Sequence, residues 1–408
     1  MTGDKKNKLF YGYVVVAAVV GIAMLAWGAN RTFGVFLEPM LNEFGWTRAG
    51  ISGAFTLCMI IMGLFAIAAG RLTDRLGPRL VLISCGVFLG LSYLLVSQVG
   101  AIWQFYLFYG LIAGIRMSGF WAPLMSMVAR WFVKRRALMS GILAAGPALG
   151  IVIMPLAFSL LISAYGWRIS YIILGSVVLV LIVLAALFLR RDPGEMGLLP
   201  YGADEGKAGG MDLQAEGLSL GEAVRTRQFW LLSTVSFCDF FLINVIVVHI
   251  VIYTIGLGIP ATTAASILSV AAGVSIPARI IMGGVADRIG NKPALMIVLI
   301  VSVVAFLLLL VARELWMLYL FAVLYGVGLW AASAIMSPLT ADLFGLKSHG
   351  TILACTVLVS AVGGAIGPVV VGHIFDVTGS YQLGFILCVA LSITGLITIM
   401  LLRPVANR

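Results

Sequence analysis

The sequence GRLTDRLG at residues 70–77 returns as GGVADRIG at residues 283–290, an offset of 213 residues. The same offset relates residues of other predicted helices: Trp103 to Trp316, Tyr106 to Tyr319, Gly150 to Gly363, and Pro155 to Pro368. One constant register over separated segments indicates an internal duplication. It predicts two structurally equivalent halves, each with one copy of this loop.

The composition around these loops is that of a membrane protein. Of the 408 residues, 62% are hydrophobic and 10% are charged, and the mean hydropathy is +1.12. Soluble domains are only about 45–50% apolar. A helix needs roughly 20 apolar residues to cross a bilayer. Twelve segments reach this length, near residues 11–36, 50–69, 80–98, 102–129, 137–163, 168–189, 228–256, 262–284, 293–312, 316–343, 351–374 and 381–402.

A polar stretch divides these segments into six and six. It is rich in Gly, Pro and mixed charge, which is typical of a flexible linker, and its end at 218–227 is expected to form a short surface helix. We expect an N-terminal bundle over 1–190, a cytoplasmic linker over 191–227 and a C-terminal bundle over 228–408. The predicted fold is an all-α membrane protein with twelve transmembrane helices in two pseudo-symmetric six-helix bundles.

The net charge of +10 follows the topology of the predicted spans. With a cytoplasmic N-terminus, about twenty Lys and Arg residues fall in cytoplasmic segments, which is the positive-inside pattern. Only Arg48, Arg168 and Arg313 fall on the other side. We therefore expect a multi-pass plasma-membrane protein with both termini cytoplasmic and no nucleic-acid partner. The first apolar run is too long for a cleavable signal peptide.

The sequence has no motif for an enzyme or an ATP-driven pump. It contains neither a Walker motif nor an arrangement of residues typical of a nucleophile. The cysteines lie within predicted spans without paired spacing, so they indicate neither a disulfide framework nor a metal site: Cys58, Cys85, Cys238, Cys355 and Cys388. We expect no enzymatic activity, no metal and no cofactor.

The two repeated loops each place an Asp-Arg pair near a helix end: Asp74 with Arg75, and Asp287 with Arg288. A carboxylate there can interact with the positive N-terminal end of a neighbouring helix. Such a contact would form a latch that stabilises the outward-facing state and breaks on opening. The alternative is that these charges only keep the loop soluble and set the topology.

Arg279 is a charged residue within a predicted span, and holding a charge at membrane depth costs free energy. It lies in TTAASILSVAAGVSIPARIIMGG, residues 262–284, without another Lys or Arg. A guanidinium stays protonated and needs an anionic or dipolar partner, and charges at membrane depth usually face a bundle interior or a water-filled cavity. Its planar fork suits a carboxylate substrate. The alternative is an internal ion pair with Asp239, which lies roughly 16 Å into its own helix.

The loops resemble the signature of the major facilitator superfamily, and the resemblance covers all twelve spans. Residues 131–146, WFVKRRALMSGILAAG, resemble the fifth-helix motif of monocarboxylate transporters, and FYGY at 10–13 stands where that family has a glycine-aromatic motif. Three further stretches resemble bacterial monocarboxylate and oxalate/formate carriers: RDPGEMGLLPYG at 191–202, RTRQFWLL at 225–232 and HIVIYTIGLGIP at 249–260.

This resemblance implies roles for several residues. Monocarboxylate transporters carry a substrate-binding Arg on the eighth helix, which Arg279 matches. Animal members have a proton-accepting Asp four residues earlier, where this chain has Ser275. Asp239 is therefore the expected substitute as proton carrier, or else a structural counter-ion. Arg31 falls where the family has a Lys in the outer cavity, so it is expected to attract anions, or else to extend to the interface.

The remaining candidates are polar or aromatic residues within spans. His249 has a side chain suited to a pH-responsive gate, or is simply hydrogen-bonded, and Asn244 is a candidate polar group of the cavity. Arg116 either contacts an anion or pairs internally with Asp239. Three aromatic residues are expected to line the substrate cavity or to serve only in packing: Trp27, Tyr325 and Trp330.

The favoured function is a secondary active transporter that moves a small monocarboxylate, such as lactate or pyruvate, with a proton by alternating access. The expected partners are the carboxylate, the proton and the lipid bilayer, and the expected form is a monomer in a bacterial inner membrane. The rival is an oxalate/formate-type exchanger. Such carriers also use a Lys on the eleventh helix, whereas residues 351–374 contain no Lys or Arg. An anion-binding sensor without transport is a third possibility.

Overall fold

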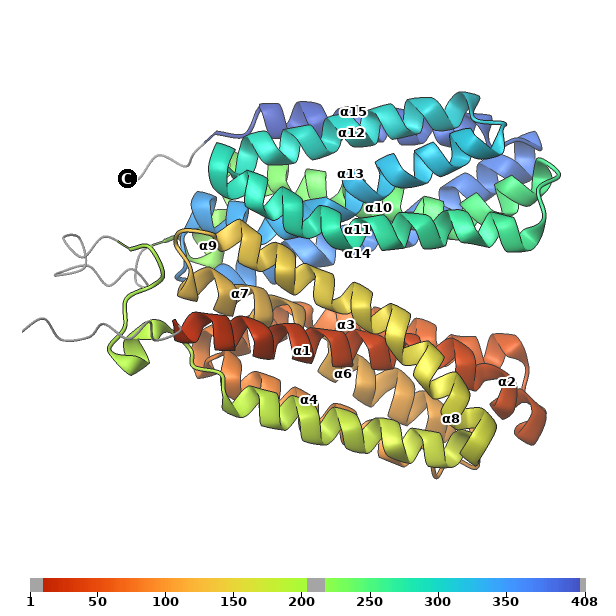
Figure 1. Ribbon diagram of the computed structural model, residues 1–408, viewed down its shortest axis with the longest axis horizontal. Helices are drawn as coiled ribbons and strands as arrows, with labels where there is room; N and C mark the ends of the chain where they lie inside the picture. The colour runs from red at the N-terminus through yellow and green to blue at the C-terminus, as the bar shows by residue number, and fades with distance from the viewer. Residues whose placement is uncertain (1–9, 204–216, 404–408) are drawn as a thin grey trace, which may run out of the picture.

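Two bundles of helices lie side by side in the computed structural model, which describes residues 10–203 and 217–403 (Figure 1). The first bundle contains α1 (Tyr11–Arg31), α2 (Phe33–Phe44), α3 (Arg48–Leu76), α4 (Pro78–Val96), α5 (Ile102–Phe105), the π-helix η1 (Tyr106–Ile112), α6 (Ala113–Met117), α7 (Trp121–Trp131) and α8 (Arg136–Leu187). The second contains α10 (Arg227–Gly256), α11 (Ala261–Ile289), α12 (Asn291–Val311), α13 (Leu315–Phe344), α14 (His349–Thr378) and α15 (Gln382–Met400).

Helix α8 accounts for two of the predicted spans. It runs for 52 residues and contains Gly166 with φ 78° and ψ 165°, a backbone conformation open to glycine, so the chain turns back there. The described residues form eleven helical segments that are long and apolar enough to cross a membrane. Because α8 holds both of the spans expected over 137–163 and 168–189, these segments match the twelve predicted spans.

The span predicted over 102–129 is not one regular helix. It contains the π-helix η1 and a turn at 118–120 before α7 begins. Tyr109 lies in η1, is buried, and donates a hydrogen bond from its hydroxyl to the carbonyl oxygen of Asn30, at 3.0 Å. The local rearrangement therefore accompanies a tertiary contact with α1, which hydropathy alone does not encode.

The duplication seen in the sequence reappears in the packing. A Cβ at Gly150 would collide with the carbonyl oxygen of Met24, and a Cβ at Gly363 would collide with that of Phe237. Both members of the second pair are 213 residues beyond those of the first. Small residues let helix backbones approach closely in membranes, so the two bundles use the same glycine for the same contact, between α1 and α8 and between α10 and α14.

The linker is attached to both bundles at equivalent positions. Its described parts contain the 3₁₀ helix η2 (Pro193–Met196) and α9 (Leu220–Val224), within the surface helix expected over 218–227. The N–H of Tyr201 donates to the carbonyl of Trp131 at 2.9 Å, and that of Leu218 donates to the carbonyl of Phe344 at 2.8 Å. Trp131 and Phe344 are again 213 residues apart.

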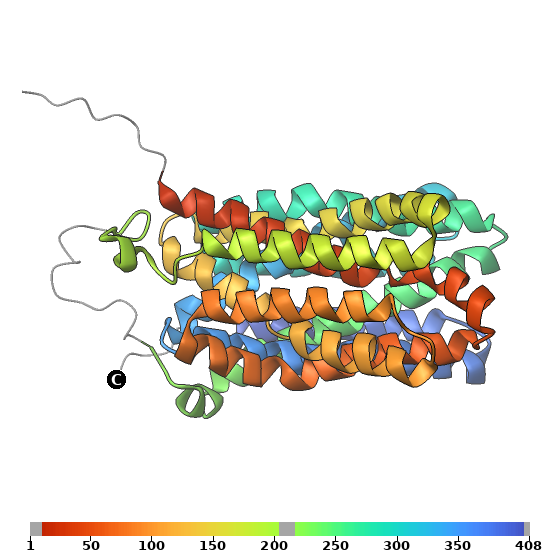
Figure 2. The same cartoon turned by 90° about the horizontal axis from the view of Figure 1, so that it is seen from below.

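Helix α1 begins and α15 ends at the end of the bundles where α9 lies (Figures 1 and 2). This end also carries the turns at Gly77 and Gly290 that follow the two repeated Asp-Arg pairs. We call it the loop end.

Candidate functional site

Arg279 connects the two bundles. From α11, its Nε donates to the carbonyl oxygen of Trp330 on α13 at 3.1 Å, within the second bundle. Its Nη1 donates to the carbonyl oxygen of Ala144 on α8 at 2.6 Å, across to the first bundle. The two backbones come close here because Gly141 has no side chain, and a Cβ on it would collide with the carbonyl of Arg279. A guanidinium has five N–H donors, so donors remain for an anion.

Trp330 and Tyr325 support Arg279 from within the second bundle. The guanidinium lies over the Trp330 ring, 5.4 Å from its centroid, and the Trp330 indole donates to the Tyr325 hydroxyl at 3.3 Å. Tyr325 in turn donates to the carbonyl of Ile243 at 3.1 Å and is fully buried. Trp330 is therefore placed beside Arg279, whereas Tyr325 is a core residue in this conformation and not a lining residue of a cavity.

Asp239 is buried on α10, with 7% of its surface exposed, and its Oδ1 has no hydrogen-bond partner among residues 10–203 and 217–403. Arg279 is the charged group that acts on it electrostatically. The direct ion pair weighed from the sequence is not formed. Within the described chain, the ion pairs are Arg136 with Asp342 and Arg168 with Glu43. Asp239 is thus a carboxylate without a direct counter-ion.

The candidates of the first bundle make their ring contacts within that bundle. Arg31, the last residue of α1, is exposed and lies 5.8 Å from the Phe55 ring centroid. Trp27 packs edge-on against Phe120 and Trp121. Arg116 lies over the Phe88 ring of α4, 4.4 Å from its centroid, and α4 is on the side of its bundle away from the second one (Figure 1). Arg116 therefore neither pairs with Asp239 nor points to Arg279.

His249 and Asn244 contact α14. His249 is buried, its Nε2 is 2.9 Å from the carbonyl of Pro368 and its Nδ1 is 3.2 Å from the Tyr381 hydroxyl. Because a carbonyl only accepts, Nε2 carries a proton and donates to Pro368, and the second hydrogen bond joins Nδ1 to the Tyr381 hydroxyl. Both ring nitrogens have hydrogen-bond partners, which agrees with the alternative that His249 is simply hydrogen-bonded. The Asn244 amide donates to the carbonyl of Phe240 on its own helix, at 2.9 Å.

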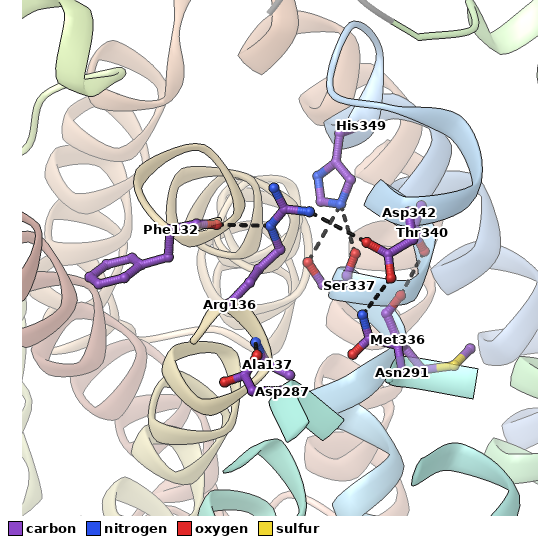
Figure 3. Close-up of polar contacts among 10 residues, drawn as sticks. All are labelled: Phe132, Arg136, Ala137, Asp287, Asn291, Met336, Ser337, Thr340, Asp342 and His349. Carbon is purple, nitrogen blue, oxygen red and sulfur yellow. Dashed lines mark hydrogen bonds and ion pairs between the residues drawn. The ribbon is translucent and has the colours of Figure 1, made fainter. Parts of the chain in front are cut away.

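The repeated aspartates hold the two bundles together at the loop end. Asp287 accepts a hydrogen bond from the N–H of Ala137 at 2.9 Å, at the start of α8 (Figure 3). It accepts a second one from the N–H of Leu138 at 2.8 Å. Asp74 accepts from the N–H and the hydroxyl of Thr351, at 3.0 and 2.5 Å, at the start of α14. Each carboxylate thus meets the positive end of a helix in the other bundle.

Arg75 and Arg288 do not take part in these contacts. Both are exposed, and neither forms an ion pair within the part of the chain that the structure describes. The aspartates alone carry the contact that the sequence assigned to Asp-Arg pairs.

Other residues, which sequence reasoning missed, join the bundles beside Asp287. Arg136 of α8 forms an ion pair of 3.5 Å with Asp342 of α13 (Figure 3). Within the second bundle, Asn291 of α12 donates to the same carboxylate at 2.6 Å. Arg130 donates to the carbonyl of Leu346 at 3.3 Å. The signal in the sequence was the basic cluster at 134–136, which points to a family motif but does not indicate these partners.

The hydrogen bonds between the bundles all lie at or near the loop end in the described residues. Arg279 and Ala144 make the deepest of them, about 12 Å along α8 from its first residue. The protein is therefore closed at the loop end, and the closing contacts include one made by the half-buried guanidinium of Arg279.

Such a fold, with two duplicated helical bundles, a linker between them and charged contacts at one end, defines a class of membrane transport proteins. Sequence comparison identifies the class more closely: the chain matches the profile of the Major Facilitator Superfamily over residues 17–315 and 275–408. The protein belongs to this superfamily and is a multi-pass membrane transporter, not an enzyme.

Similar proteins of known name cover nearly the whole chain. "Monocarboxylate transporter 13" of Rattus norvegicus is 27% identical over 390 residues, which cover 94% of this chain and 87% of the relative. "Oxalate:formate antiporter" of Oxalobacter formigenes is 28% identical, covering 90% and 85%. "Monocarboxylate transporter 2" of Homo sapiens is 24% identical, covering 93% and 83%.

Solved structures agree in fold. The transporter FucP in the outward conformation superposes with a TM-score of 0.74 at 15% identity, covering 97% of this chain and all of that one. The proton:xylose symporter XylE gives a TM-score of 0.76 at 13% identity, covering 96% of each chain. At these identities the likeness concerns the fold alone.

Proposed function

We propose that this transporter moves a small monocarboxylate together with a proton, by alternating access, across a bacterial inner membrane. Arg279 is the observation that carries the proposal. Its guanidinium is satisfied on two sides by backbone carbonyls, which bring no countercharge, so it keeps its full positive charge and spare donors for an anion. Two relatives named for monocarboxylates support the same class of substrate.

Asp239 is the proposed proton carrier. Its carboxylate is buried without a direct counter-ion, a situation in which the charged form is costly. A substrate anion at Arg279 would cancel the field of this guanidinium at Asp239 and so favour uptake of the proton. Protonation and substrate binding would then occur together, which is the requirement for symport.

The substrate is also proposed to compete with Ala144 for Arg279. A carboxylate bound bidentately would take N–H groups from the carbonyl on α8 and so remove one bond between the bundles. With both termini and the linker in the cytoplasm, the loop end is the cytoplasmic end and the described conformation is outward-facing. Asp74 and Asp287 are then latches that stabilise this state, and the monomer contains every part of the cycle.

An oxalate/formate-type exchange is the second candidate, because the Oxalobacter antiporter is as similar as the monocarboxylate carriers. The absence of Lys and Arg from residues 351–374 favours the monocarboxylate. Arg116 does not supply the second charge, since it lies against Phe88 of α4.

Uptake of labelled lactate, pyruvate, formate and oxalate into proteoliposomes, with and without an inward proton gradient, tests the proposal. We expect gradient-driven uptake of lactate or pyruvate. Uptake of oxalate only against internal formate would favour the exchanger, and binding without uptake would favour the sensor.

The matched pair Arg279→Gln and Arg116→Gln tests the site. Each removes one guanidinium from a predicted span, but only Arg279 lies between the bundles. Loss of two charge-assisted hydrogen bonds predicts that Arg279→Gln lowers uptake by at least about 100-fold, while Arg116→Gln keeps most of it. Equal uptake by Arg279→Gln and the unmodified protein would refute the assignment.

A further inference from the structure

The second bundle has a basic groove at the loop end that is separate from Arg279. We propose that this groove binds the phosphate headgroup of an anionic phospholipid. The inference does not depend on which substrate the protein transports, since the groove lies between α10 and α15 and includes no residue of the proposed site.

The groove encloses about 210 Å³ where α10 begins and α15 ends. Arg227, the first residue of α10, contributes one guanidinium, and Arg403, just beyond α15, contributes the other. Its remaining lining residues are Gln228, Leu231, Met400 and Leu401. Two cations therefore share one small polar space with an amide that can also donate.

Neither arginine has a side-chain partner among the residues that the structure describes. Within residues 10–203 and 217–403, neither donates a side-chain hydrogen bond or forms an ion pair. The carbonyls at the end of α15 do not serve them, because Lys292 donates its Nζ protons to Met400 and Leu402, at 2.9 and 2.7 Å. The fork of a guanidinium matches a phosphate in geometry and charge, so a phosphodiester supplies what both side chains lack.

The apolar side of the groove favours a lipid over a free anion. Met400 and Leu401 are each 48% exposed, and Trp230, one turn beyond Arg227, is 56% exposed. The Trp230 indole N–H donates to the carbonyl of Val224 at 3.0 Å, and the ring stays exposed on the protein surface. Exposed aromatic and apolar residues at a helix end mark the bilayer interface, and basic pockets there bind anionic headgroups. Acyl chains would cover these residues, which inorganic phosphate leaves bare.

The test measures the thermal unfolding of the purified full-length protein in neutral detergent. Dioleoylphosphatidylglycerol, dioleoylphosphatidylcholine and inorganic phosphate are titrated separately. We expect saturable stabilisation by phosphatidylglycerol alone. Each basic residue near a membrane surface contributes about five-fold in affinity, so the double variant Arg227→Gln/Arg403→Gln should bind phosphatidylglycerol roughly 30-fold more weakly.

The controls separate this site from general charge. Arg225→Gln/Arg288→Gln removes two exposed arginines that do not line the groove, and it should leave the affinity unchanged. Arg403 lies beyond the end of α15, so we expect Arg403→Gln to fold. This single substitution should weaken binding about five-fold. Equal stabilisation by phosphate, equal binding by phosphatidylcholine, unchanged affinity in Arg403→Gln, or an equal loss in the control pair would each overturn the proposal.

Discussion

Arg279 is held by backbone carbonyls on two sides, and this arrangement depends on the shape of its side chain. A lysine has the same charge but only a single ammonium group, without a planar fork. It cannot keep the contact to Trp330 and also offer two parallel N–H groups to a carboxylate. Binding at position 279 therefore needs the planar shape of arginine as well as its positive charge.

Arg279→Lys should fold but transport poorly. We expect the KM for the carboxylate to rise by about tenfold or more, because at least one charge-assisted hydrogen bond is lost. Concentration-dependent uptake in proteoliposomes measures this change. A variant with the KM of the unmodified protein would show that a point charge suffices.

Asp239 provides a test of proton coupling that keeps the shape of the site. Asp239→Asn should abolish the acceleration of uptake by an inward proton gradient while exchange of substrate continues. Because its Oδ1 makes no hydrogen bond among the described residues, removal of this buried charge should not destabilise the protein. Uptake at several external pH values, together with the thermal unfolding temperature, checks both expectations. Unchanged pH dependence would assign the proton to another group.

At the level of helices, close contact between the bundles depends on glycine. A Cβ at Gly283 of α11 would collide with the carbonyl of Ala137 at the start of α8, whereas a Cβ at Gly284 would meet only the Leu138 side chain at 3.6 Å. Neighbouring positions in one helix thus differ only in whether they face the other bundle's backbone.

Gly283→Ala should open the loop end, and Gly284→Ala should not. Both substitutions raise helix propensity by the same amount, about 1 kcal/mol, so the difference isolates the contact between bundles. Spin labels at Leu80 of α4 and Ile289 of α11, both exposed, would report a longer distance only in Gly283→Ala. Equal distances in the two variants would argue against a role for this contact in closure.

For the molecule as a whole, the duplication creates two equivalent contacts between the bundles, which we propose act as independent latches. Asp287 meets the start of α8, and Asp74 meets the start of α14, with partners related by the offset of 213 between Leu138 and Thr351. A carboxylate at a helix N-terminus contributes about 0.3–1 kcal/mol, and up to about 2 kcal/mol when partly buried.

Asp74→Asn and Asp287→Asn should each shift the equilibrium toward an open loop end by about five-fold, the equivalent of about 1 kcal/mol. Because the latches have no shared partners, the double variant should shift it by about 25-fold. The same pair of spin labels measures these populations. A double variant no more open than either single one would show that the latches act as one unit.

Hydropathy and the repeat were sufficient to predict the membrane class and the spans, and the resemblance of the repeated loops predicted the superfamily. These properties are carried by each segment by itself, since an apolar run of sufficient length needs a bilayer wherever it packs. The contacts of Asp74 and Asp287 with helix N-termini also followed from their positions, because a helix end exposes the same N–H groups in any helix.

The partners of buried side chains did not follow from the sequence. Arg279 binds the carbonyls of Ala144 and Trp330, which no pattern could single out because every residue has a carbonyl. Arg116 turns toward Phe88, and Asp239 has no direct ion pair with Arg279, since the rotation of each helix about its axis decides where a side chain points. That rotation results from the packing of many residues at once, so the sequence determined which charges enter the membrane and the packed bundles decided what each of them contacts.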